Sequence, residues 1–258
     1  MTLLTDRRIL VVGAGTRASD DPDAPVGNGR AIAVVAGREG ASVACADIDP
    51  AACAATVALV EAEGATAHAL TADVSDPDEC AGLIEAAEAA MGGLDGLVLN
   101  VGIGAGVGMT GTTAAQWDQV FAVNVRAHFL LAGAALPRMS DGGSIVFISS
   151  IAGLTAGTRI PSYDSSKSAL TGLCRQTAAE GARRGIRANV VAPGLIDTPL
   201  GRAASGGRPS REKAPVPLGR QGTAWEVAEP VVFLLSDRAS YITSQLLAVD
   251  GGLTQCRG

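Results

Sequence analysis

The sequence predicts a single α/β domain, residues 1–258, in which a parallel sheet of about seven strands carries helices on both faces. Three observations predict it: short apolar runs alternate with longer amphipathic stretches, no repeat recurs at a fixed period, and no long linker divides the 258 residues. Consecutive parallel strands need long crossover connections, and helical crossovers cover both faces of a sheet. We therefore expect a doubly wound fold.

The strands are expected where short apolar runs border glycine or charged residues. Ile9–Val12, between Arg8 and Gly13, is typical of a strand buried on both faces. The other strands are expected at Ser42–Ala46, Ala67–Leu70, Gly96–Leu99, Ser144–Ser149, Arg187–Val191 and Leu246–Val249.

The helices are expected between these strands, where apolar residues recur at helical spacing. Arg30–Glu39 shows this spacing and is ended by Gly40. Pro77–Met91 begins with proline, whose missing N–H costs nothing at that position. The other helices are expected at Pro50–Glu63, Thr113–Arg138, Tyr163–Arg184 and Ala224–Ser236.

Two segments interrupt the alternation, and both are expected to be surface loops. Thr16–Val26 contains three Asp and two Pro, which excludes a helix or a central strand. Pro199–Lys213 contains four basic residues and one Glu, a charge of +3 in a chain of net charge −6. Long loops in compact domains are often functional, so residues 199–213 are a candidate substrate lid.

Composition excludes several classes of protein. A chain that is 47% hydrophobic can build a core, and the net charge of −6 with eight aromatic residues argues against nucleic-acid binding. No stretch reaches the ~18 apolar residues of a membrane span, and Asp6, Arg7 and Arg8 stand where a secretory signal would be apolar. Five scattered cysteines and two distant histidines favour no metal site and a reducing, cytoplasmic setting.

The junction between the first strand and the first helix is a candidate pyrophosphate site. Gly13, Gly15, Gly27 and Gly29 lie there, and such a junction presents backbone N–H groups and a positive helix end to a phosphate. Asp47 follows the second strand, where a carboxylate binds the adenosine ribose hydroxyls and repels a 2′-phosphate. The glycines can also serve ordinary turns, and Asp47 can instead cap the helix that follows it.

Tyr163 and Lys167 are a candidate catalytic pair. They are four residues apart on a predicted helix, so their side chains share one face. A nearby ammonium favours the phenolate of a tyrosine, which then exchanges a proton with an alcohol oxygen while a hydride moves at the carbon. Such a pair also occurs by chance on helix surfaces.

These residues give the chain, from about Arg8 to Thr254, a resemblance to the short-chain dehydrogenases/reductases, in the branch with the motif Tyr-x-x-x-Lys. Gly13, Gly27 and Gly29 match the glycines of that family's Thr-Gly-x-x-x-Gly-x-Gly motif, with Val12 in place of Thr. Thirteen residues separate the first two glycines rather than three, so the loop carries a ten-residue insertion.

The resemblance implies two further catalytic residues. Ser150 lies thirteen residues before Tyr163, where the family has its catalytic serine, and its hydroxyl would bind the substrate oxygen. Its neighbour Ser149 is the competitor, but adjacent side chains at a strand point to opposite faces. Asn124 matches the family residue that helps to hold a water beneath the lysine.

The resemblance also implies the cofactor contacts. Asp73 and Val74 match an adenine-contacting pair, and Ile196 and Thr198 would hold the nicotinamide carboxamide. The implied cofactor-binding residues are Gly13, Gly15, Gly27, Asn28, Gly29, Asp47, Ile48, Asp73, Val74, Asn100, Gly102, Tyr163, Lys167, Pro193, Gly194, Ile196 and Thr198.

The function implied is an NAD-dependent oxidoreductase, with NADP as the other possible cofactor, that interconverts a secondary alcohol and a ketone with Tyr163 as general acid/base. The family's habit of assembly implies a homotetramer or dimer. One alternative is an NADPH-linked 3-oxoacyl thioester reductase, if Arg17 or Arg38 reaches a 2′-phosphate. Another is a dinucleotide sensor without catalysis. An enoyl reductase is less favoured, because that branch spaces its Tyr and Lys further apart.

Overall fold

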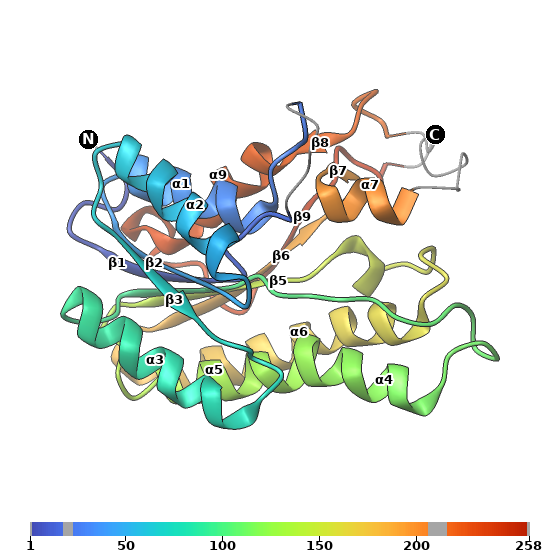
Figure 1. The fold of residues 1–258 in the computed structure, drawn as a ribbon, viewed down its shortest axis with the longest axis horizontal. Coiled ribbons are helices and arrows are strands. Elements are labelled where there is room, and N and C mark those ends of the chain that lie inside the picture. The colour runs from blue at the N-terminus through green and yellow to red at the C-terminus, as the bar shows by residue number, and fades with distance from the viewer. Residues whose placement is uncertain (1, 18–22, 206–215, 257–258) are drawn as a thin grey trace.

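The computed structural model describes residues 2–17, 23–205 and 216–256. Its centre is a seven-stranded sheet in the order β3-β2-β1-β4-β5-β6-β9, with every neighbouring pair parallel (Figure 1). The strands are β1 (Arg8–Val12), β2 (Ser42–Asp47), β3 (Ala67–Thr71), β4 (Gly96–Leu99), β5 (Ser144–Ile148), β6 (Arg187–Pro193) and β9 (Leu246–Val249). The predicted doubly wound sheet is confirmed.

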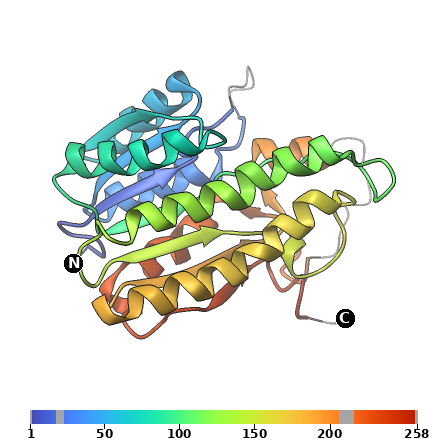
Figure 2. The same ribbon diagram turned by 90° about the horizontal axis from the view of Figure 1, so that it is seen from below.

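Helices cover both faces of the sheet (Figures 1 and 2). One face carries α1 (Asn28–Arg38), α2 (Pro50–Ala62) and α9 (Ala224–Leu235). The other carries α3 (Pro77–Met91), α4 (Ala114–Phe121), α5 (Ala127–Ala135) and α6 (Pro161–Gly181). Within the described part of the chain, no helix is both long enough and apolar enough to span a membrane.

The central strands divide the core into two layers. Ile9 and Val11 of β1 pack with α1 and α9, whereas Leu10 and Val12 pack with α3, α5 and α6. All four side chains are at most 1% exposed. Burial on both faces explains why β1 is a continuous apolar run rather than an alternating one.

The topology brings the candidate site residues to one edge of the sheet. Because all seven strands are parallel, the residues that follow β1, β2, β4, β5 and β6 meet at the carboxyl edge. The strand order reverses between β1 and β4, and ligands of doubly wound folds bind outside the carboxyl ends at such a reversal.

Three features differ from the sequence-based expectation. The helix expected at Thr113–Arg138 contains a π-helical turn, Ala122–Arg126, between α4 and α5. The loop expected at Pro199–Lys213 begins instead with helix α7 (Pro199–Ser205), because Pro199 stands in its first turn and Thr198 Oγ1 accepts a hydrogen bond from Gly201 N. A small second sheet joins β7 (Ile196–Asp197) to β8 (Gly222–Thr223).

Candidate active site

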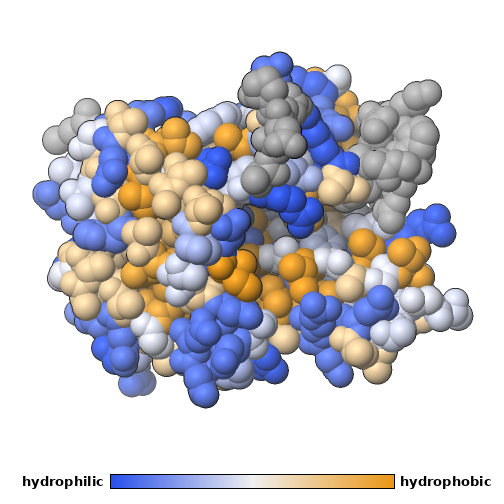
Figure 3. Space-filling view, in the orientation of Figure 1, coloured by the Kyte–Doolittle hydropathy of each residue, from blue (hydrophilic) through white to orange (hydrophobic). Residues whose placement is uncertain are grey.

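Two neighbouring cavities lie at the carboxyl edge, on the hollowed face of the molecule seen in Figure 3. The first, here called the dinucleotide groove, has a volume of about 490 Å³ and runs from the glycine loop and Asp47 to Tyr163. The second, here called the substrate cavity, has about 360 Å³ and is lined by Ser150, Tyr163 and Gly194. Residues shared by both walls are Arg17, Asn28, Ser149, Tyr163, Thr198 and Leu200.

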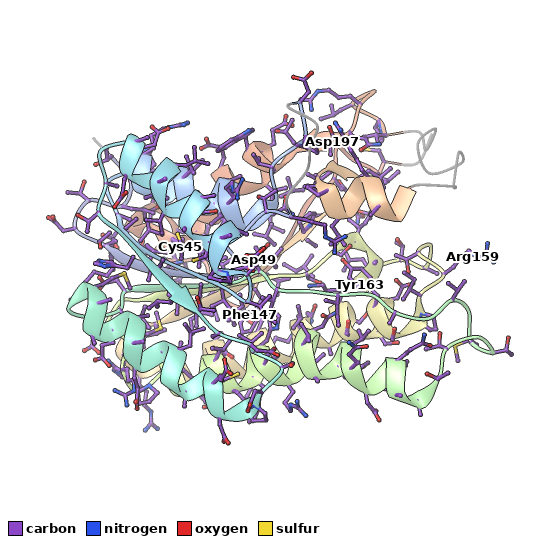
Figure 4. The ribbon with its side chains drawn as sticks, viewed as in Figure 1. Cys45, Asp49, Phe147, Arg159, Tyr163 and Asp197 are labelled. Atoms are coloured by element: carbon purple, nitrogen blue, oxygen red, sulfur yellow. The ribbon has the colours of Figure 1, made fainter. Side chains whose placement is uncertain are left out.

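Tyr163 and Lys167 lie on one face of α6, as their spacing predicts. Lys167 is 3% exposed, and its Nζ lies 5.8 Å from the centre of the Tyr163 ring. The ammonium donates a hydrogen bond of 2.9 Å to the carbonyl of Ile148 at the end of β5. Burial lowers the pKa of Lys167 to about 8. Figure 4 places Tyr163 in the region between α6 and α7.

The two serines after β5 have different surroundings. Ser149 is buried, and its hydroxyl donates to the carbonyl of Lys167 at 2.8 Å. Ser150 lines the substrate cavity with Tyr163, and its Oγ accepts a hydrogen bond of 3.1 Å from Ala152 N. The Ser149 hydroxyl therefore uses its proton in a hydrogen bond to α6. The Ser150 hydroxyl acts as an acceptor toward Ala152 N, so its proton can be donated to a group in the cavity.

Asn124 is fully buried in the π-helical turn and connects two segments. Its Oδ1 accepts from Ile103 N at 2.9 Å, and its Nδ2 donates to the carbonyl of Ile103 and to Ser166 Oγ at 2.9 Å each. The side chain is thus committed to fixing the loop after β4 against α6. That loop brings Gly102 so near that a Cβ there would lie 2.9 Å from Lys167 Nζ.

The glycine loop is tightly closed against α1. A Cβ on Gly29 would lie 1.9 Å from the carbonyl oxygen of Gly13, which also accepts a hydrogen bond of 2.8 Å from Asn100 Nδ2. Gly13 has φ = +81°, a conformation that favours glycine. Gly27 N donates to Thr16 Oγ1 at 2.9 Å, so the insertion leaves and rejoins the loop at adjacent points.

Asp47 is oriented by backbone groups at the far end of the groove. Its Oδ2 accepts from Gly15 N at 2.7 Å, and its Oδ1 accepts from Asp49 N at 3.1 Å. A Cβ on Gly15 would lie 2.7 Å from Asp47 Oδ2, so glycine is needed there. The cap of α2 is Asp49 and not Asp47, because Asp49 accepts from Ala51 N and Ala52 N. The capping alternative for Asp47 is therefore wrong.

The remaining implied cofactor residues divide between the two cavities. Ile48, Asp73, Val74, Asn100 and Gly102 line the groove. Pro193, Gly194 and Ile196 line the substrate cavity, and Thr198 lines both. Gly194 permits close packing, since a Cβ there would lie 2.6 Å from the Cβ of Asp250. The structure thus gathers every implied site residue around the two cavities except Asn124, which lies behind their wall.

Arg38 and Arg17, the two arginines considered as contacts of a 2′-phosphate, lie in different places. Arg38 lies at the end of α1 and pairs with Glu63 at 2.9 Å, outside the described lining of the groove. Arg17 lines both cavities. In the candidate lid, Arg202 pairs with Asp197 at 2.7 Å, and Arg208, Arg211 and Lys213 lie outside the described residues.

Sequence reasoning missed one of the residues that line the substrate cavity, Gln221. Gly104 and Leu200 lie in two segments that the sequence assigns to the substrate pocket, the loop at 101–109 and the lid at 199–213, whereas Gln221 lines the cavity and follows no local signal. A separate cavity of about 800 Å³ lies between Arg202 and Arg220. Its arginines pair with Asp197 and Glu226, and it contains none of the implied catalytic residues.

Comparison with known proteins finds relatives of this chain both in sequence and in structure. Residues 25–254 match the family model described as enoyl-(acyl carrier protein) reductase. The chain is 40% identical to 2-(S)-hydroxypropyl-CoM dehydrogenase 3 of Xanthobacter autotrophicus, over 88% of this chain and 92% of that protein. A structure described as a short-chain dehydrogenase/reductase of Burkholderia xenovorans superposes with a TM-score of 0.91 at 32% identity over 100% of both chains. The NADPH complex of a blue fluorescent protein from a metagenomic library has a TM-score of 0.88 at 34% identity, covering 98% and 99%.

Proposed function

The chain belongs to the short-chain dehydrogenase/reductase family of nicotinamide-dependent oxidoreductases, and we propose that it interconverts a secondary alcohol and a ketone with NAD. One observation carries the proposal: Ser150 and Tyr163 line the same cavity, beside the groove that contains Lys167. The 2-(S)-hydroxypropyl group in the name of one relative is a secondary alcohol, which supports this substrate class.

The groove fits a nicotinamide dinucleotide. A Cβ at Gly13, Gly15 or Gly29 would meet backbone or side-chain atoms at 1.9 to 2.9 Å, so these glycines keep the loop closed while its backbone faces the groove. Asp47, Ile48 and Asp73 would hold the adenosine end, and Thr198 the nicotinamide end. The bound nicotinamide would supply the hydride acceptor, and the other steps fall to side chains of this chain.

Proton transfer is assigned to Tyr163. A cation beside a phenol favours the phenolate, and Lys167 is held in that position by the carbonyl of Ile148. Tyr163 would take the proton of the substrate hydroxyl during oxidation and return it during reduction. The Ser150 hydroxyl would donate a hydrogen bond to the same oxygen and stabilise its developing negative charge. Asn124 would act as a positioning residue, because its side chain fixes the loop beside Lys167.

The preference for NAD is proposed from Asp47. Two backbone N–H groups orient its carboxylate at the far end of the groove, where a 2′-phosphate would meet like charge. An NADPH-linked 3-oxoacyl thioester reductase needs a cation at that end, and Arg38 is paired elsewhere with Glu63. A spacing of four residues between Tyr163 and Lys167 favours the alcohol-oxidising branch over an enoyl reductase.

Three wider assignments accompany this function. Residues 199–213 are proposed as the substrate lid, since Leu200 of α7 lines both cavities.

A homotetramer or dimer is proposed because Phe129 of α5 is 57% exposed and Leu247 of the edge strand β9 is 43% exposed. Light scattering after gel filtration measures the assembly. The proposed location is the cytoplasm.

A spectrophotometric screen at the nicotinamide band tests the function. The purified chain is assayed with NAD and NADP against secondary alcohols, and with NADH and NADPH against ketones and 3-oxoacyl thioesters. Oxidation of alcohols that is faster with NAD supports the proposal. Turnover confined to NADPH and 3-oxoacyl thioesters supports the alternative reductase. Dinucleotide binding without turnover of any substrate supports a sensor.

A further inference from the structure

The ten-residue insertion places an arginine between the two cavities. Arg17 is the first inserted residue, and it lines both the dinucleotide groove and the substrate cavity. The hydrogen bond from Gly27 N to Thr16 Oγ1 fixes the point where the insertion leaves the loop. Arg17 is exposed, and no ion pair joins it to another residue in the described part of the chain.

The charges around Arg17 make it the available cation of this region. Asp47, Asp49 and Asp73 place carboxylates along the groove. Among the described lining residues, Lys167 is the other cation, but it is 3% exposed and its ammonium bonds to Ile148. Arg17 is the one charged side chain among the described residues that line the substrate cavity. Arg17 is therefore the exposed positive charge that an anionic ligand meets when it enters these cavities.

A second observation at the same place also indicates a ligand. Asn28 follows Gly27 at the start of α1 and lines both cavities, and its Oδ1 is buried with no hydrogen-bond partner among the described residues. Buried acceptors are rarely left unpaired, so this atom indicates a bound molecule with a hydrogen-bond donor, such as a ribose hydroxyl of the dinucleotide, because an ionised pyrophosphate has no proton to donate. No acidic side chain occupies the first turn of α1, and Gly27 offers no side-chain cap, so the positive end of this helix faces the junction uncompensated.

We propose that Arg17 binds the pyrophosphate of the dinucleotide, so that the insertion adds a charged contact to the glycine loop. This inference rests on the proposed use of NAD. The position of Arg17 separates this role from contact with a 2′-phosphate. Arg17 lines the substrate cavity together with Ser150 and Gln221. Asp47, which marks the place of a 2′-phosphate, lines only the groove and not the substrate cavity. A guanidinium suits this task, because its planar donors match two phosphate oxygens at once.

Calorimetric titration with NAD, ADP-ribose and adenosine tests the proposal. ADP-ribose contains the pyrophosphate without the nicotinamide, and adenosine contains neither. Arg17→Met keeps an unbranched stem in place of the aliphatic part of arginine and removes the charged guanidinium. Arg183→Met removes an exposed arginine that lies outside the described lining of both cavities. We expect Arg17→Met to weaken NAD and ADP-ribose about tenfold, the effect of losing one charge-assisted hydrogen bond. Its affinity for adenosine, and all affinities of Arg183→Met, should stay within about twofold of wild type.

Equal affinity of wild type and Arg17→Met for ADP-ribose overturns the proposal. If that variant also shows a raised KM for an acidic but not for a neutral substrate, the anion that Arg17 meets belongs to the substrate. Partial recovery by Arg17→Lys, and a smaller loss of ADP-ribose affinity with added salt in Arg17→Met, support the contact. A wild-type chain that binds ADP-ribose in an Arg17-dependent way but oxidises no alcohol contradicts the proposed reaction and leaves this contact intact.

Discussion

Lys167 lies with its Nζ 5.8 Å from the centre of the Tyr163 ring, buried and hydrogen-bonded to the end of the central strand β5. The pair is held by two elements that are continuous with the core: α6, which carries both residues, and the sheet, which holds the ammonium. Burying the ammonium of Lys167 lowers the stability of the folded chain, because a charged group loses its hydration there. Its retention on the wall of a cavity is the pattern expected of a functional group.

Tyr163→Phe is expected to reduce kcat by a factor of at least about 100, the usual contribution of general acid–base catalysis, while the Kd for NADH stays within about twofold. The phenol acts on the substrate oxygen, so its loss should not disturb the adenosine end. Stopped-flow turnover and NADH fluorescence titration measure the two effects. Tyr241→Phe is the matched control, because Tyr241 is fully exposed on the surface. Near-normal turnover of Tyr163→Phe would exclude the proposed proton transfer.

The pKa of Lys167 predicts a change of stability with pH. Burial lowers this pKa from 10.5 to about 8, so between these values the unfolded chain binds more protons than the folded chain. The free energy of unfolding due to this group therefore rises with pH in that window, by at most about 3 kcal/mol, and is independent of pH below it. Urea unfolding of wild type and Lys167→Met between pH 7 and 10 measures the difference. A constant difference across this range would contradict the shifted pKa.

Asp47→Ala is expected to narrow the preference for NAD over NADP about tenfold or more, because a 2′-phosphate would no longer meet a carboxylate. The ratio of kcat/KM with the two cofactors measures the preference. Asp76→Ala removes a carboxylate that caps α3 and does not line the described groove, so it should leave the ratio unchanged. A wild-type chain that prefers NADP would show that the insertion, and not Asp47, determines the choice.

The sequence predicted the sheet well because burial on both faces forces continuous apolar runs. Gly96–Leu99, which is buried along its length, was predicted with the bounds that the structure shows, and so was the apolar but partly exposed edge strand Leu246–Val249. The π-helical turn at Ala122–Arg126 could not be predicted, since one extra residue barely changes the apolar pattern of a long helix. Helix α7 was missed because Gly201 and the charges that follow are typical of a loop.

The candidate site was predictable where it follows strand ends. Asp47, Asn100, Ser150 and Pro193 meet because parallel strands place their carboxyl ends at one edge. Gln221 and Arg17 share the substrate cavity although they lie near opposite ends of the chain. No local pattern connects these two residues, because their proximity depends on the packing of loops after the sheet has formed.

The charged part of the candidate lid is expected to be solvated rather than to recognise substrate. Arg208→Ala/Arg211→Ala should therefore change kcat/KM for an anionic substrate and for a neutral one of similar shape by the same factor. The measurement is repeated at low and high salt, because steering by exposed charges fades as the screening length falls below about 10 Å. A loss confined to the anionic substrate at low salt would instead assign these arginines to recognition of negative charge.

Two glycines in helices should respond oppositely to alanine. Gly82 lies on the exposed side of α3 with no atom within 4 Å of a Cβ built on it, whereas a Cβ on Gly29 would lie 1.9 Å from the carbonyl oxygen of Gly13. Gly82→Ala should raise the free energy of unfolding by about 0.5–1 kcal/mol, because alanine loses less backbone entropy in a helix. Gly29→Ala must separate α1 from the glycine loop, so it should lower stability and weaken NADH binding at least about tenfold. Thermal unfolding and NADH titration of both variants measure these effects. If Gly29→Ala binds NADH like wild type, the close approach of α1 to Gly13 is not needed to hold the dinucleotide.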